Sequence, residues 1–117
     1  MSIDQSNAID FLVHDKKNQR AALLISDQLD WEHDEPRHLE LLQDKLNHYL
    51  WFIESGEMEK STPDLAGLPV VIIVWAKHPL SDNGKKYYGL AQQRIDELGF
   101  ALEFDLNGEA FRALMDQ

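Results

Sequence analysis

The chain begins with alternating apolar and polar residues that predict two paired strands. Residues 8–15 place Ile9, Phe11 and Val13 on one face, as in a half-buried strand. A second apolar segment, residues 20–26, follows after the polar stretch 15–18. Two such segments joined by a short polar turn predict a β-hairpin.

Two later segments repeat their apolar residues at the three- and four-residue spacing of a helix. The first spans residues 37–54, and the second runs through residue 98 from a cap supplied by Ser81 or Asp82. The stripes consist of Leu39, Leu42, Leu46, Tyr49 and Ile53 in the first, and Tyr87, Ala91, Ile95 and Leu98 in the second.

The flanks of these helices carry the signals of helix ends. Asp34 or Glu35 is expected as the N-cap of the first helix, with Pro36 in its first turn. Gly56 and Gly99 follow the two apolar stripes, and glycine readily adopts the left-handed conformation that ends a helix.

Two further strands complete the predicted sheet. Residues 69–77 are apolar on both parities and rich in β-branched side chains, which is typical of a strand that is central or covered on both faces. Residues 100–106 alternate cleanly and predict a strand with one buried face. Residues 57–68 show no period and are expected to form a loop with at most a short extended piece.

The resulting order is strand, strand, helix, strand, helix, strand, with residues 108–117 left for a short terminal helix. This order predicts one α+β domain over residues 1–117, a two-layer sandwich of a mixed four-stranded sheet with two helices on one face. The last two strands should be parallel because a right-handed crossover connects them. The sequence leaves the strand order open.

Assigning apolar side chains to the two sheet faces leaves some of them without a cover. Those expected to face the helices are Ile9, Phe11, Val13, Leu23, Ile25, Phe100, Leu102 and Phe104. Those on the opposite face are Leu12, Leu24 and one parity of the third strand, Ile73 and Trp75 or their neighbours. The terminal segment with Phe111, Leu114 and Met115 is expected to cover this second face; the alternative is a homodimer or partner surface.

Composition limits the function. The 117 residues include 21 acids against 11 Lys plus Arg, for a formal charge of −10, and no cysteine. Nucleic-acid binding is disfavoured because there is no basic run. The longest apolar run is far too short to span a bilayer, and no export signal is visible, so a cytoplasmic protein is expected. The charge can serve solubility alone or attract a basic protein partner.

Residues 29–38, with the sequence LDWEHDEPRH, concentrate the residue types that bind metals. Imidazole and carboxylate groups are competent ligands, and the candidates are Asp27, Asp30, His33, Asp34 and His38. The spacing lacks a His-Glu-x-x-His pattern, and acids are also favoured at the positive end of a helix. We therefore prefer the interpretation that these acids form the start of the first helix rather than a metal site. No catalytic residue and no cofactor are predicted, because nucleophile-elbow and P-loop patterns are absent.

Two tryptophans, Trp31 and Trp51, can each be interpreted as part of the core or as part of an interface with a partner. Trp51, with Leu50 and Phe52, makes the second half of the first helix apolar nearly all round, as in a deeply buried helix or one that meets another surface. Trp31 lies among the acids and has the same two interpretations. An exposed aromatic side chain of this kind can anchor a partner.

Longer segments resemble a known family. ISDQLDW at residues 25–31 and LLQDKLNHYLWFIESG at residues 41–56 resemble a family of small uncharacterised bacterial proteins, a domain of unknown function. The resemblance implies no activity and no catalytic residue. Small acidic proteins of this general type also occur as immunity proteins that neutralise bacterial toxins, which is an analogy of type.

The sequence therefore favours a non-enzymatic protein-binding module, most specifically an immunity-type protein that neutralises a basic toxin domain. The predicted partner-contact residues are Asp27, Asp30, Trp31, Glu32, Asp34, Glu35 and Trp51. A competing prediction is a metal-dependent or small-ligand enzyme, built on Asp27, Asp30, His33 and His38. A third is a housekeeping domain whose acidic surface only keeps it soluble.

Overall fold

A four-stranded sheet organises the structure. The computed structural model describes residues 3–5 and 8–117. Strands β1 (Phe11–Asp15), β2 (Arg20–Asp27), β3 (Val70–Ala76) and β4 (Ala101–Leu106) lie in the order β1-β2-β3-β4. β1 pairs antiparallel with β2, whereas β2, β3 and β4 are mutually parallel neighbours. The predicted mixed sheet of an α+β fold is confirmed, and the strand order is now fixed.

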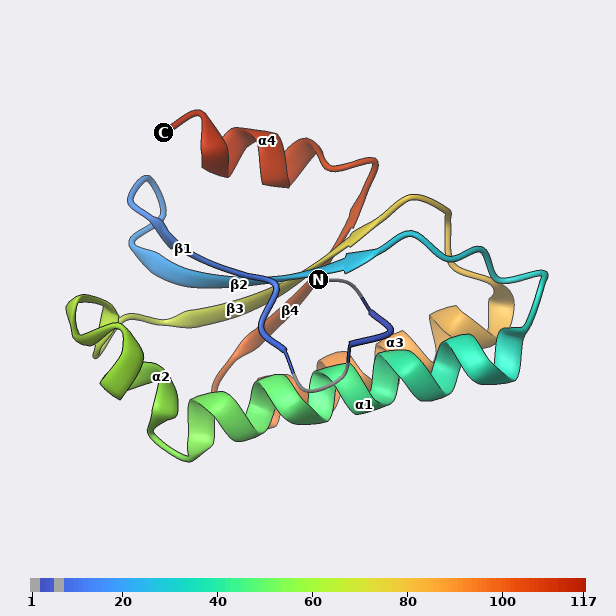
Figure 1. Cartoon of the computed structure of the whole chain (residues 1–117), viewed down its shortest axis with the longest axis horizontal. Coiled ribbons are helices and arrows are strands. Elements are labelled where there is room, and N and C mark those ends of the chain that lie inside the picture. Colours follow the sequence, from blue (N-terminus) through green and yellow to red (C-terminus); the bar gives the residue numbers. More distant parts are fainter. Residues whose placement is uncertain (1–2, 6–7) are drawn as a thin grey trace.

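Helices lie on both faces of the sheet. α1 (Glu35–Glu54) and α3 (Asp82–Glu97) share one face, and the short α4 (Glu109–Met115) lies on the other (Figure 1). Each long helix lies in the connection between two parallel neighbouring strands. The parallel pairing of β3 with β4 confirms the prediction for the last two strands, and that of β2 with β3 is an addition to it. Within residues 3–5 and 8–117, no helix is both long and apolar enough to cross a membrane.

The predicted ends of the two long helices are confirmed. Asp34 is the N-cap of α1, where its side chain accepts a backbone N–H of the first turn, and Pro36 lies in that turn. Ser81 caps α3 in the same way. Gly56 and Gly99 follow the two helices with φ angles of 87° and 90°, the left-handed region that glycine enters without strain.

The segment between α1 and β3 differs from the prediction of a loop. The chain instead forms the short helix α2 (Glu57–Ser61) and a 3₁₀ turn, η1 (Pro63–Leu65). Met58 and Leu65 are the buried residues of these two turns. Elements of five and three residues are too short to display a helical period, so the sequence pattern could not reveal them.

The two faces of β1 are the reverse of the prediction. Phe11 pairs with Leu24 and Leu12 pairs with Leu23 across the hairpin, and directly opposed residues share a face. Phe11 and Val13 therefore join Leu24 in the cluster that includes α4, whereas Leu12 joins the main core with α1 and α3. The alternation identifies the strand, but the hairpin register decides which side chains meet which helix.

α4 covers the second face of the sheet, as expected of the terminal segment. Leu114 is buried in the apolar cluster of that face, and Phe111 stacks on Trp75 with ring centroids 4.4 Å apart. Asp105, at the end of β4, accepts hydrogen bonds from two N–H groups in the first turn of α4, which fixes the helix to the sheet. Met115, also expected in this cover, is 47% exposed.

A glycine sets the entry into α4. Gly108→Ala should lower the free energy of unfolding by about 1–3 kcal/mol, because Gly108 has φ +78° and a Cβ there would lie 2.5 Å from Nε1 of Trp75. The matched control is Gly89→Ala in α3, where the new Cβ meets nothing within 4 Å. That change should raise stability by about 0.5–1 kcal/mol. Urea unfolding measures both, and two shifts in the same direction would contradict this account.

A buried ion pair fastens the N-terminal segment to α1. Nζ of Lys45 lies 2.8 Å from Oδ1 of Asp10, and both side chains are fully buried. Lys45 also donates to the carbonyl oxygens of Gln5 and Ala8, at 2.6 and 2.7 Å. Asp10 in turn accepts the backbone N–H of Ser26 at 3.0 Å. All three donors of the ammonium group are used, which is the condition under which a protein tolerates a buried charge.

Candidate functional site

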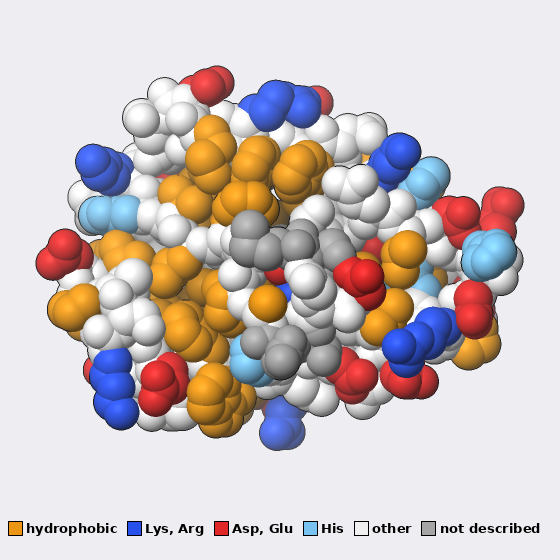
Figure 2. All heavy atoms as spheres, in the orientation of Figure 1, with side chains coloured by type: hydrophobic (Ala, Val, Ile, Leu, Met, Phe, Trp, Pro, Cys, Tyr) orange, Lys and Arg blue, Asp and Glu red, His pale blue; other side chains and the backbone are white. Residues whose placement is uncertain are grey.

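The carboxyl ends of the parallel strands meet the beginnings of both long helices at one edge of the sheet. β2 ends at Asp27 and β3 at Ala76, and the loops that follow them lead into α1 and α3. Ligands of open α/β sheets typically bind outside this edge, where the loops carry functional side chains. Figure 2 shows acidic and histidine side chains, with basic ones among them, at the end of the molecule where α1 begins.

A hollow of about 510 Å³ opens between these two loops, and we call it the acidic groove. Its lining consists of Asp30, Trp31, Glu32, Glu35, His78, Pro79, Leu80 and Ser81. Three of these residues carry a carboxylate, and none is Lys or Arg. The groove therefore favours a positively charged group.

Two of the groove acids are held in place by hydrogen bonds. Oδ1 of Asp30 accepts the backbone N–H of His33 at 2.8 Å, and Oε1 of Glu35 accepts the side-chain amide of Asn83 at 2.8 Å. The His33 hydrogen bond lowers the pKa of Asp30, and hydrogen bonds from Asn83 and then Ser81 lower the pKa of Glu35. Both acids are thus ionised at neutral pH, and Glu35 links the start of α1 to the start of α3.

A buried histidine–aspartate pair supports the loop that carries the groove. Nε2 of His38 lies 2.6 Å from Oδ2 of Asp27, and Nδ1 lies 2.9 Å from the backbone oxygen of Asp30. Trp31 stacks on the imidazole, with ring centroids 3.7 Å apart and an interplanar angle of 16°. The side chains of His38 and Asp27 are 1% and 2% exposed. Together these contacts hold residues 28–34 against α1.

The charged form of His38 suits these partners. A carbonyl oxygen can only accept, so Nδ1 carries a proton, and a protonated ring also donates from Nε2 to the Asp27 carboxylate. Burial lowers the pKa of His38, but the hydrogen bond and charge of Asp27, together with the Asp30 carbonyl and carboxylate, outweigh it and raise the pKa above the usual 6.5. The imidazolium is therefore stabilised by the fold.

The side chains of Asp27, Asp30, Asp34 and His38, four of the residues in the metal hypothesis, already form hydrogen bonds within the protein. Both ring nitrogens of His38 are engaged, by Asp27 and by the Asp30 carbonyl, and neither is free for a metal ion. Asp34 is occupied as the N-cap of α1. Across residues 3–5 and 8–117, no three His, Asp or Glu side chains gather in a way that could hold a metal ion.

Most of the predicted partner-contact residues lie at this edge, but not all of them reach the surface. The accessible ones are Asp30, Glu32, Asp34 and the partly exposed Glu35. Asp27 is 2% exposed and Trp31 is 5% exposed. These two side chains therefore support the acidic surface from inside, and a partner would meet the acids around them.

Trp51 lies apart from the acidic groove. Its side chain is 53% exposed and stacks on His48, with ring centroids 5.4 Å apart. Trp51 follows Glu35 by sixteen residues on the same helix, which is roughly 24 Å at 1.5 Å per residue. A partner that contacts both must span that length.

The sequence did not predict the half of the groove that comes from the loop between β3 and α3. His78, Pro79, Leu80 and Ser81 line it, and Asn83 fixes Glu35. The signal that could have found them is the strand order. Once β2 and β3 are parallel neighbours, their following loops must meet at one edge, so the residues before α3 belong beside those before α1.

Comparisons with known proteins address the family of the chain. No curated protein and no solved structure matched it. The model of a family of unknown function, DUF6572, matches residues 1–108. This match includes every strand, α1 and α3, and it ends just before α4. The chain therefore belongs to DUF6572, a family of unknown function.

Proposed function

We propose that this chain is a non-enzymatic protein-binding module whose acidic groove receives Lys or Arg side chains of a basic protein. The proposal rests on the groove itself, a hollow of about 510 Å³ that is lined by Asp30, Glu32 and Glu35 and by no Lys or Arg. Because hydrogen bonds already fix Asp30 and Glu35, less side-chain freedom is lost when they pair with a cation.

The charge of the whole chain supports the same partner. A formal charge of −10 creates a negative field, which attracts a basic protein over long range and raises the association rate. Asp34, at the exposed start of α1, extends the acidic surface beside the groove. The expected interaction is therefore fast and sensitive to salt, with the groove acids at its centre.

In its most specific form, we propose an immunity-type protein of the cytoplasm that binds and blocks a basic toxin domain. What supports this form is the type of chain, which is small and strongly acidic and has three carboxylates in the lining of its groove. Blocking would be both steric and electrostatic, with the groove acids pairing with Lys or Arg side chains that the toxin uses on its own substrate.

Neutralising the exposed acids should slow association with such a partner at least tenfold at low salt and flatten its salt dependence. The variant carries Asp30→Asn, Glu32→Gln, Asp34→Asn and Glu35→Gln. Asn is as good an N-cap as Asp, and the amide oxygens can still accept the hydrogen bonds of the acids, so the fold is retained. Native lysate is passed over immobilised wild type, and the association rate of a retained basic protein is then measured for both chains.

A charge-matched control separates the groove from the net charge. Glu54→Gln, Asp64→Asn, Asp96→Asn and Glu97→Gln remove four exposed acids that lie outside the groove lining. The proposal requires this control to bind nearly as fast as wild type. If both variants slow association equally, the effect comes from the overall charge and not from the groove. If the groove variant binds as fast as wild type, the partner contacts another surface. For a toxin partner, co-expression with wild type, but not the groove variant, should restore growth.

A further inference from the structure

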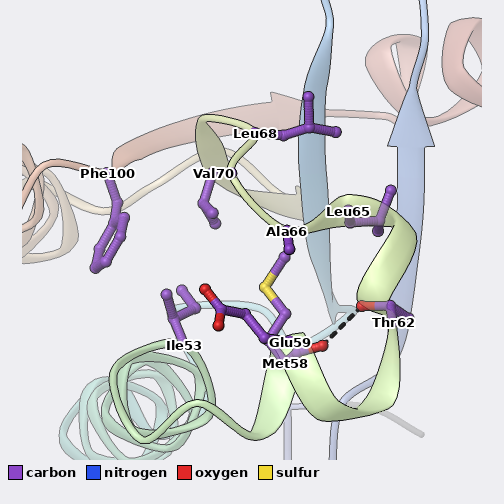
Figure 3. Close-up of a pocket in the computed structure, with 10 residues that line it drawn as sticks. Ile53, Met58, Glu59, Thr62, Leu65, Ala66, Leu68, Val70 and Phe100 are labelled. Atoms are coloured by element: carbon purple, nitrogen blue, oxygen red, sulfur yellow. Dashed lines mark hydrogen bonds between the residues drawn. The ribbon is translucent and has the colours of Figure 1, made fainter.

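A second hollow lies at the opposite end of α1 from the acidic groove. It has a volume of about 320 Å³ and is walled by the end of α1, by α2 and η1, and by the residues at the beginnings of β3 and β4. Its apolar side chains are those of Ile53, Met58, Leu65, Ala66, Leu68, Val70 and Phe100 (Figure 3). We call it the apolar cavity. Its volume lies at the lower end of the range of small-molecule sites, roughly 300–1,000 Å³.

One charged side chain belongs to this cavity. Among its described lining residues, Glu59 alone carries a charge. Figure 3 shows the Glu59 carboxylate reaching into the space beside Ile53, on the side that faces Phe100. The other polar side chain of the lining, Thr62, already donates its hydroxyl to the Met58 carbonyl at 2.8 Å.

The Glu59 carboxylate has no cation of its own. The neighbouring Lys60 pairs with Glu57 instead, at 3.6 Å. In the part of the chain that the structure describes, no hydrogen bond or ion pair engages the Glu59 side chain. An apolar cavity with one unpaired carboxylate at its edge has the chemistry that complements an apolar body with a single positive charge.

We propose that the apolar cavity binds a small molecule composed of an apolar chain or ring and one protonated amine. The apolar part displaces water from the walls formed by Met58, Leu65 and Phe100, and the ammonium group pairs with Glu59. Gly67 has φ +84°, and a Cβ added there would meet nothing within 4 Å. This glycine lets the chain turn between η1 and β3, so that residues of both line the same cavity.

This site is independent of the acidic groove. The two lie at opposite ends of the 20-residue α1, about 30 Å apart at 1.5 Å per residue. Their occupants also differ in kind, since the groove is proposed to take a protein surface and the cavity a small molecule. Failure of either proposal leaves the other standing.

The test is a titration of the whole chain with n-alkylammonium chlorides from propyl to octyl, followed by the NMR signals of the methyl groups of Met58, Leu65 and Leu68. Each added methylene should tighten binding about fourfold until the cavity is filled. Hexylammonium should bind up to about fivefold more tightly than hexanol, and hexanoate should bind most weakly. Titration without saturable shifts of these methyl groups would overturn the proposal.

Three variants test whether Glu59 selects the ammonium group and whether the ligands bind in the apolar cavity. Glu59→Gln, at an exposed position, should abolish the preference for hexylammonium over hexanol while hexanol binding persists. Glu54→Gln removes the same charge from an exposed residue outside the lining and should keep the preference. Ala66→Phe, at the exposed rim of the cavity, should weaken all ligands at least tenfold. A preference that survives Glu59→Gln would show that the carboxylate does not select the ligand.

Discussion

Replacing Lys45 by methionine should lower the free energy of unfolding by about 3–5 kcal/mol, the cost of breaking a buried ion pair on one side. Asp10 would remain fully buried with its charge uncompensated. The carbonyl oxygens of Gln5 and Ala8 would lose their donor as well. Because a domain of this kind has only about 5–15 kcal/mol of stability, the variant should unfold at a much lower urea concentration.

A double variant distinguishes the ion pair from simple packing. Adding Asp10→Asn to Lys45→Met removes the stranded charge, and the free energies of unfolding should show a coupling of at least about 1 kcal/mol between the two sites. The control Lys85→Met changes an exposed lysine of α3 and should alter stability by less than about 0.5 kcal/mol. A Lys45→Met chain as stable as this control would rule out the buried pair.

The parts of the fold that were predictable are those set by local chemistry. Asp34 and Ser81 cap helices because short polar side chains accept the free N–H groups of a first turn. Gly56 and Gly99 end them because glycine tolerates a positive φ. Each signal acts within four residues of its own position, so a single sequence contains all that is needed.

The faces of β1 and the short helix α2 depend on contacts that lie far apart in sequence. Whether Phe11 or Leu12 meets α1 is decided by the register of the pairing with β2, not by the alternation within β1. The packing of α2 depends on the burial of Met58, which the sequence pattern of five residues could not indicate.

The buried polar residues of α1 show which contacts near the site could not be predicted from the sequence. The buried face of this helix contains His38 and Lys45 among leucines and Tyr49, at helical spacing with them. This spacing indicates that both side chains are buried. Their ion-pair partners could not be predicted from the sequence, because Asp10 and Asp27 approach α1 only after the sheet has formed. The accessibility of Asp30, Glu32 and Asp34, in contrast, agrees with their density of charge in the sequence.

Replacing His38 by leucine should lower the free energy of unfolding by about 3–5 kcal/mol at pH 6, because Asp27 would be left buried without its charged partner. Among the described residues, the Asp27 side chain would keep the hydrogen bond from the Leu29 N–H, at 3.2 Å. The stack with Trp31 would also be lost, so this tryptophan should become more accessible to a fluorescence quencher. Adding Asp27→Asn should recover part of the loss.

The stabilisation by His38 should depend on pH in a definite direction. The pKa of His38 is raised in the folded chain, where its bonds and attraction to Asp27 outweigh burial. The folded state therefore holds this proton more tightly than the unfolded state, whose histidine pKa is about 6.5. The stabilising effect is fully present below pH 6.5 and is lost as the pH rises through the folded pKa. Urea unfolding from pH 5.5 to 9 should show the difference between wild type and His38→Leu shrinking above pH 6.5. His14→Gln, at an exposed position of β1, should follow the wild-type curve throughout, and a difference that grew with pH would mean that the buried ring is neutral.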